Sequence, residues 1–126
     1  MPENDNFRIM LVDDDEDTQK IFRVVMQHYQ LDLEIFTDAE SALERLKEKP
    51  DPDVMVIDIV LPGIDGYQML GRSRTLAPEC SMIATTAYHS QTTANEVEHW
   101  GFNGFLPKPL QPATLVDDLK KFMSHN

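Results

Sequence analysis

The stretch FRIMLVDDDED at residues 7–17 decides the fold of this chain. A short, mostly apolar run stops abruptly at five consecutive acidic side chains. The stretch VMVIDIVLPGIDG at residues 54–66 has the same design, because its apolar start ends near Asp58 and turn-forming residues follow. Short apolar runs with such boundaries are typical of strands buried on both faces of a parallel sheet. We therefore predict two central strands, each with carboxylates at its end.

Strand-like and helix-like segments alternate on both sides of these two runs. Residues 31–35 alternate apolar with acidic side chains, which indicates a strand with one face in water. Elsewhere apolar residues return at steps of three and four, the period of an amphipathic helix. The predicted strands are 7–12, 31–35, 54–57, 82–87 and a short segment after residue 101, and the predicted helices are one after residue 17, then 39–46, 67–76, 90–100 and one from Pro112. Strict alternation predicts an α/β domain with helices on both faces of a parallel sheet.

The character of each strand also predicts its place in the sheet. The first and third strands are continuously apolar and belong in the middle, whereas the alternating second strand belongs at an edge. Pro107 near the end of the fifth strand suits the other edge, because proline cannot donate to a strand ladder. The order 2-1-3-4-5 satisfies these observations. We predict a single, doubly wound, five-stranded parallel sheet in that order.

The composition narrows the possible classes of function. The chain has 126 residues with 22 acidic and 11 basic side chains, a formal net charge of −11. A field of that sign repels phosphate backbones, so we expect no direct contact with nucleic acid. No apolar run resembles a signal peptide or approaches the ~20 residues of a membrane span, so we expect a cytoplasmic protein without a membrane segment. Residues 1–6 are predicted to form a flexible tail, and residues 7–126 one domain.

Chemically useful side chains stand where the predicted strands end. In open parallel sheets, sites form beyond the carboxyl ends of the strands, near the point where the strand order reverses. The first strand ends in Asp13 and Asp14, the third in Asp58 and the fourth in Thr86, and Lys108 follows the fifth. The predicted order therefore brings three carboxylates, a hydroxyl and an ammonium to one crevice.

This set of groups indicates phosphoryl chemistry with a bound cation. Three neighbouring carboxylates repel one another, so they favour raised pKa values or a bound cation. Oxygen ligands without histidine or cysteine suit Mg²⁺ or Mn²⁺. A carboxylate can also act as a nucleophile toward phosphorus, while a metal and a lysine neutralise charge on the phosphoryl oxygens. The set is complete for accepting a phosphoryl group.

Several of these residues also have ordinary structural explanations. Asp15, Glu16 and Asp17 are interpreted as helix-capping acids, since carboxylates favour a helix N-terminus. Asp65 before a glycine is interpreted as a turn or cap residue. Alternation along the fourth strand directs Thr85 to the opposite face of the sheet from Thr86. For the acidic pair that ends the first strand a structural role alone is a weak explanation, because burying acids is costly.

The same motifs resemble the receiver domain of response regulators over essentially the whole chain. They are LVDDD with Asp13 and Asp14, DIVLPGIDG with Asp58, Thr86-Ala87 at a strand end, and GFNGFLPKP with Phe105 and Lys108. Each motif alone is weak, but four in the correct order at strand ends are specific. The resemblance implies a fold like that of the chemotaxis receiver CheY.

The resemblance also implies a role for each acidic residue. Asp58 would receive a phosphoryl group from a phosphohistidine on a histidine kinase or histidine phosphotransfer protein. Asp14, Asp58 and the backbone carbonyl of Val60 would coordinate Mg²⁺ or Mn²⁺, and Asp13 would act mainly through a metal-bound water. Such a chain catalyses only its own phosphorylation and dephosphorylation, so we expect no enzyme acting on a separate substrate.

The remaining motif residues are implied to transmit the signal. Lys108 would contact the acceptor carboxylate, Thr86 would move toward the phosphoryl group, and Phe105 would swing inward behind it. The face of the fourth helix, fifth strand and fifth helix would then change shape for an unknown downstream protein. Trp100 is a candidate contact on that face, although a packing role is equally compatible with its position. Phe105 departs from the family, which often has tyrosine there, and the Lys108–Pro109 bond is expected to be cis.

Two other functions compete with the phosphorylation-controlled switch. A metal-dependent aspartyl-phosphate phosphatase would need a second acid two residues after its nucleophile, and here that residue is Val60. A receiver that is never phosphorylated and serves as a scaffold would be expected to lack one of the acid, threonine or lysine groups. The oligomeric state is left open between a monomer and a weak dimer.

Overall fold

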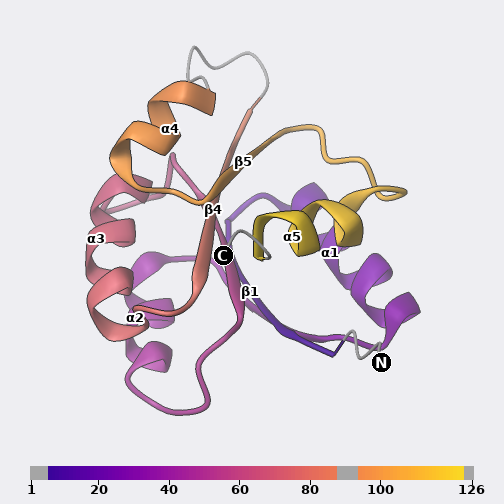
Figure 1. Ribbon diagram of the computed structural model, residues 1–126, viewed down its shortest axis with the longest axis horizontal. Helices are drawn as coiled ribbons and strands as arrows, with labels where there is room; N and C mark the ends of the chain where they lie inside the picture. The colour runs from indigo at the N-terminus through magenta and orange to yellow at the C-terminus, as the bar shows by residue number, and fades with distance from the viewer. Residues whose placement is uncertain (1–5, 88–93, 124–126) are drawn as a thin grey trace.

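A parallel sheet lies between two layers of helices in the computed structural model, which describes residues 6–87 and 94–123 (Figure 1). The sheet has five strands in the order β2-β1-β3-β4-β5. The strands are β1 (Arg8–Val12), β2 (Asp32–Phe36), β3 (Val54–Asp58), β4 (Ser81–Thr86) and β5 (Gly104–Pro107). The helices are α1 (Glu16–Tyr29), α2 (Ala39–Leu46), α3 (Gly66–Leu76), α4 (Ala94–Trp100) and α5 (Leu115–Met123). The predicted fold class and strand order are confirmed.

The burial of the strands follows the predicted division into centre and edge. Every residue of β3 and β4 is buried, and so is all of β1 after its first residue, whereas no residue of β2 is fully buried. Apolar side chains on one face of the sheet pack with α2, α3 and α4, and those on the other face pack with α1 and α5 (Figure 1). Two buried clusters therefore fix the sheet from both sides and hold its strand ends in place.

Some predicted boundaries differ from the structure. The last helix begins at Leu115 rather than Pro112, and residues 112–114 form a turn. Thr114 stands directly before α5, where a hydroxyl residue is favoured, and its carbonyl accepts the first helical bond, from the backbone N–H of Asp118 at 2.9 Å. The fourth strand ends at Thr86, one residue earlier than predicted. The first four residues of the predicted helix 90–100, and residues 1–5 of the predicted tail, lie outside the described residues.

Aspartates begin three of the helices. The carboxylates of Asp15, Asp38 and Asp65 accept backbone N–H groups at the starts of α1, α2 and α3. Asp65 belongs to a capping box, in which Gln68 bonds back to the cap residue. The capping roles predicted for Asp15 and Asp65 are confirmed.

Gly66 brings the start of α3 against the segment that leaves β3. A Cβ atom at Gly66 would lie 2.5 Å from the Cα of Ile59, closer than packed atoms allow. The backbone N–H of Gly66 donates to the carbonyl of Ile59 at 2.7 Å. This close approach folds the loop after Asp58 tightly back on itself. Within the described residues, no helix is long and apolar enough to cross a membrane.

Candidate functional site

Three carboxylates meet at the carboxyl ends of β1 and β3. Asp13 and Asp14 follow β1 directly, and Asp58 is the last residue of β3. Each offers one oxygen atom, and these oxygens lie within 4.8 Å of one another. Asp13 and Asp58 are only 0% and 6% exposed, whereas Asp14 is exposed to solvent. The predicted convergence is present, with two buried acids and one that faces water.

Lys108 is the cation of this cluster. Its Nζ lies 3.0 Å from Oδ2 of Asp13, 3.3 Å from Oδ2 of Asp58 and 3.4 Å from Oδ2 of Asp15. Its backbone N–H donates to the carbonyl of Thr86 at 2.9 Å, which ties the segment after β5 to the end of β4. The Lys108–Pro109 bond is cis, as the resemblance implied. One ammonium is therefore shared by three carboxylates from two parts of the chain.

The backbone near each buried acid satisfies one of its oxygens. Oδ1 of Asp13 accepts the backbone N–H of Asp15 at 2.9 Å, and Oδ1 of Asp58 accepts that of Val60 at 2.9 Å. Oδ2 of Asp13 is fully buried and makes no hydrogen bond, although it forms the ion-pair contact with Lys108. A buried carboxylate oxygen with incomplete pairing is a costly feature for a fold to retain. This oxygen can therefore accept a further hydrogen bond, for example from a water bound to a cation.

Burial and charge shift the pKa values at this site in opposite directions. Burial raises the pKa of Asp13 from 3.8 to about 6, and the nearby charge of Asp58 adds to this, against the hydrogen bond from Asp15 and the charge of Lys108. Burial also lowers the pKa of Lys108, but Asp13 and Asp58 outweigh that effect and raise it. The lysine therefore stays charged, yet one positive charge does not fully compensate Asp13.

The residues present fit a divalent cation. All the candidate ligands are hard oxygen atoms, and neither histidine nor cysteine joins the cluster among the described residues. Mg²⁺ and Mn²⁺ prefer such ligands, and Mg²⁺ is often held by only one or two carboxylates together with water and phosphate oxygens. Oδ2 of Asp13 makes no hydrogen bond and shares the ammonium of Lys108 with Asp58, so the three acids of the cluster lack compensating positive charge. A cation bound here would supply it.

The two neighbouring threonines of β4 occupy different faces of the sheet. The hydroxyl of Thr85 donates to the carbonyl of Leu106 at 2.6 Å, so it is engaged in joining β4 to β5. Thr86 is buried and, by strand alternation, follows Ala84 toward the α2, α3 and α4 layer. Because Asp58 is in register with Thr85, Thr86 lies one residue beyond Asp58 at the same sheet edge. The distinction predicted between the two threonines agrees with these contacts.

The residues predicted to carry a signal lie on the α4 and β5 side of the sheet. Phe105 of β5 is half-buried against the cluster that contains Val97 of α4. Trp100 at the end of α4 is 57% exposed, and its ring lies 4.9 Å from that of Tyr67 in α3. Trp100 thus both packs on α3 and presents surface to solvent, so packing and partner contact are both compatible with it.

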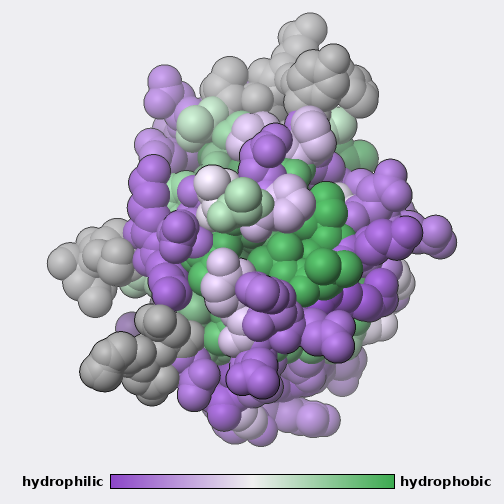
Figure 2. Space-filling model, turned by 90° about the vertical axis from the view of Figure 1, so that its right-hand side faces the viewer, coloured by the Kyte–Doolittle hydropathy of each residue, from purple (hydrophilic) through white to green (hydrophobic). Residues whose placement is uncertain are grey.

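A groove lies beside Lys108, between α1 and the segment after β5. It has a volume of about 240 Å³, and its apolar lining includes Ile21, Pro109 and Leu110. Figure 2 shows the side of the molecule that carries α1 and α5, where hydrophobic surface gathers in the middle and hydrophilic side chains surround it. The acidic cluster therefore has an apolar surface next to it.

Asp15 is the site residue whose contact the sequence did not reveal. It was predicted to cap α1, and it does, but Oδ2 also lies 3.4 Å from Nζ of Lys108. A hydrogen bond from Thr18 is the main reason that the pKa of Asp15 is lowered. A third consecutive acid after the first strand was the available signal. Its contact depends on a lysine 93 residues away in sequence, which local pattern does not predict.

Comparisons with known proteins found a matching family and several relatives. The response regulator receiver domain family matches residues 9–120. An uncharacterised 14.6 kDa protein encoded in the sodA1 3′ region of Leptolyngbya boryana is 33% identical, over 86% of this chain and 83% of its own length. The transcriptional regulatory protein ZraR of Escherichia coli K12 is 29% identical over 97% of this chain, which spans only 27% of ZraR.

A solved structure shows the same fold. The crystal structure of a CheY-like response regulator receiver domain protein from Methanospirillum hungatei JF-1 superposes with a TM-score of 0.81. The two chains are 24% identical, and the match covers 93% of each. The layered architecture is therefore shared at low sequence identity.

Proposed function

This chain belongs to the response regulator receiver domain family, and we propose that it is a phosphorylation-controlled binding switch with Asp58 as its phosphoacceptor. One observation carries the proposal. The carboxylate of Asp58 ends a central strand between a cluster suited to a divalent cation and Nζ of Lys108 at 3.3 Å. With a cation bound in that cluster, Asp58 would lie between two positive groups, which suits attack on phosphorus and neutralisation of the product.

In the proposed reaction, an oxygen of Asp58 forms a bond to the phosphorus of a phosphohistidine. The phosphorus–nitrogen bond breaks, and the imidazole nitrogen of the donor keeps the electron pair. Lys108 contacts the negative charge on the phosphoryl oxygens, as a fixed cation does in other phosphoryl transfers. The N–H of Val60 holds one oxygen of Asp58, which orients the carboxylate for attack. Hydrolysis of the acyl phosphate then returns the chain to its starting state.

We assign the metal ligands to Asp14, Asp58 and the backbone carbonyl of Val60, with Asp13 acting mainly through a bound water. A bound Mg²⁺ or Mn²⁺ supplies positive charge to the transferring phosphoryl group. Asp13 is the most deeply buried of the acids, which agrees with an indirect role. Asp14 is exposed and available to an ion arriving from solvent.

Phosphorylation would shift an existing equilibrium between two states of the α4–β5–α5 face. Thr86 would move to donate its hydroxyl to the phosphoryl group, and Phe105 would fill the space that this leaves. Phe105 is half-buried against the α4 side of the core, so an inward swing of its ring would bury it further. Trp100 on α4 is the proposed contact for the downstream protein.

The proposed partners are proteins in the cytoplasm. The donor is a histidine kinase or a histidine phosphotransfer protein, and the apolar groove beside Lys108 offers it a surface next to Asp58. The net charge of −11 argues against direct contact with nucleic acid. We propose residues 7–126 as the receiver unit and a monomer or weak dimer as its state.

The rival functions are less well supported by the same site. A phosphatase of the aspartyl-nucleophile class needs an acid two residues after the nucleophile, but Val60 stands there with 70% of its surface exposed. A scaffold that is never phosphorylated would not need Lys108 held among carboxylates. Turnover of a phosphate ester by the purified chain would favour the first rival over the switch.

Intact-mass measurement tests the proposed function directly. With Mg²⁺ and a small phosphodonor such as phosphoramidate, the wild type is expected to gain the mass of one phosphoryl group. Asp58→Asn should show no gain, because the nucleophile is absent. The matched control is Asp53→Asn, which changes the aspartate directly before β3, whereas Asp58 is the last residue of that strand. A phosphorylated Asp58→Asn variant, or an unmodified wild type, would contradict the assignment.

A further inference from the structure

Lys108 has one carboxylate partner that does not belong to the candidate metal cluster. The cluster consists of Asp13, Asp14 and Asp58. Nζ of Lys108 also lies 3.4 Å from Oδ2 of Asp15, which the cluster does not include. Lys108 therefore contacts two acids of the candidate metal cluster, Asp13 and Asp58, and one acid outside it, Asp15.

Lys108 and a divalent cation would interact with the same two buried carboxylates. Nζ of Lys108 lies 3.0 Å from Asp13 and 3.3 Å from Asp58, so a divalent ion that binds Asp58 directly and Asp13 through a water weakens both contacts. Only 14% of the lysine side chain is exposed, and a largely buried ammonium without a partner is unfavourable. Cation binding is easier when another carboxylate is already in reach of the ammonium.

Asp15 is held in position for that role. Oδ1 accepts the backbone N–H of Asp17 at 3.1 Å, and Oδ2 accepts the hydroxyl of Thr18 at 2.8 Å. Its own backbone N–H donates to Oδ1 of Asp13 at 2.9 Å. The hydrogen bonds that cap α1 thus hold the Asp15 carboxylate beside the cluster, although Asp15 is not one of the candidate metal ligands.

We propose that Asp15 is a positioning residue that takes over Lys108 when a divalent cation occupies the cluster. This inference rests on the proposed function, because it requires that the cluster binds Mg²⁺. Lys108 then remains charged, ordered and close to Asp58 for contact with the phosphoryl group. Asp15 therefore acts through Lys108, and it does not touch the reacting atoms.

Three variants separate this role from capping and from general charge. Asp15→Asn keeps a side chain that caps helices well but removes the negative charge. Asp17→Asn is the matched control, because it removes an acid from the same helical turn that makes no contact with Lys108 among the described residues. Asp15→Glu restores the charge on a longer side chain.

The first measurement is the Mg²⁺ dissociation constant of the full chain by titration calorimetry. Asp15→Asn is expected to weaken binding about fivefold, the effect of losing one partly exposed ion pair, whereas Asp17→Asn changes it less than about twofold. Asp15→Glu should recover part of the loss. Equal weakening of Mg²⁺ binding in Asp15→Asn and Asp17→Asn would mean that only the total negative charge near the cluster matters, and this would overturn the inference.

The second measurement follows the ammonium of Lys108 by nitrogen-detected or proton–nitrogen NMR. In the wild type, its signal should persist at saturating Mg²⁺, because the pairing with Asp15 slows exchange with water. In Asp15→Asn the signal should broaden or vanish when Mg²⁺ is added. Weaker Mg²⁺ binding with an unchanged Lys108 signal would make Asp15 a direct ligand and overturn the positioning role. A wild type that binds no Mg²⁺ would overturn the proposed function itself.

Discussion

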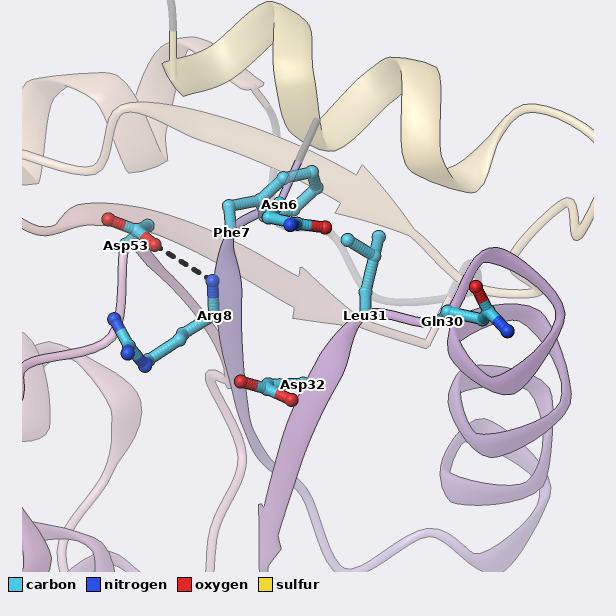
Figure 3. A pocket seen from close by; sticks show the side chains of 7 residues that line it. All are labelled: Asn6, Phe7, Arg8, Gln30, Leu31, Asp32 and Asp53. Carbon is cyan, nitrogen blue, oxygen red and sulfur yellow. Dashed lines mark hydrogen bonds between the residues drawn. The ribbon is translucent and has the colours of Figure 1, made fainter. Parts of the chain in front are cut away.

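The two ends of the sheet use aspartate in different ways. At the amino ends of the strands, Oδ2 of Asp53 accepts the backbone N–H of Arg8 at 2.8 Å (Figure 3). The backbone of Asp53 also donates to Arg8 and accepts from Ser81, so this residue joins the starts of three strands. At the carboxyl ends, Asp13 and Asp58 are buried around a single lysine.

This difference separates charges that serve the fold from charges that serve a ligand. Figure 3 shows Arg8, Asp32 and Asp53 around an open pocket of about 300 Å³, where water reaches the polar groups. Each charge there is solvated or satisfied by the backbone. At the other end Asp13 and Asp58 share one lysine, and burial, with a smaller contribution from the charge of Asp58, raises the pKa of Asp13 to about 6. A fold retains such an imbalance where a bound ion relieves it.

The largest expected effect on stability comes from removing the charge of Lys108 at the carboxyl ends of the strands. Lys108→Gln should lower the free energy of unfolding by about 2 kcal/mol without Mg²⁺, because the buried carboxylates lose their partner. Excess Mg²⁺ should restore most of this loss. At the other end, Arg8→Gln should change stability by less than about 0.5 kcal/mol, since it is the backbone of Arg8 that bonds Asp53. Urea denaturation of both variants, with and without Mg²⁺, checks the contrast; equal losses would erase it.

Replacing Asp13 is expected to change stability by a smaller amount and in the opposite direction, so that the variant is more stable than the wild type. The folded pKa is raised from 3.8 to about 6, so the folded state binds more protons than the unfolded state in that window. Stability without Mg²⁺ therefore falls as pH rises from about 4 to about 6 and then levels off. Asp13→Asn should remove this slope and stabilise the chain at pH 7 by on the order of 1–2 kcal/mol.

Denaturation curves between pH 4 and pH 8 measure the Asp13 effect. The same variant should bind Mg²⁺ more weakly than the wild type, so stability and ion binding change in opposite directions. An Asp13→Asn variant that is less stable than the wild type at pH 7 would show that this acid serves the fold.

A still smaller loss of stability than that of Lys108→Gln is expected for Asp53→Ala, at the amino ends of the strands. Asp53→Ala removes the acceptor for the N–H of Arg8 and should cost about 1 kcal/mol, the usual contribution of one hydrogen bond. Because this end carries no ion site in our proposal, the loss should be the same with and without Mg²⁺, and phosphorylation of Asp58 should be unaffected. A Mg²⁺-dependent loss would mean that the two ends are coupled.

Local pattern was sufficient to tell central strands from edge strands. The apolar runs of β1 and β3, the alternation in β2 and Pro107 in β5 are compatible with the observed strand order, which was chosen because known sheets of this kind have it. Pro112 was a weaker guide, since proline suits a first helical turn but equally suits the turn that precedes Thr114 and α5. Helix starts depend on such local competition between neighbouring residues.

The sequence by itself determined the chemistry available at the strand ends: which carboxylates, hydroxyl and ammonium would gather, and in which order along the sheet. Only the tertiary structure decided how these groups share charge. It buried Asp13, left Asp14 in water and placed Asp15 within reach of Lys108. Burial and distance between residues far apart in the chain set pKa values and ion pairs, and neither quantity is encoded in a local pattern.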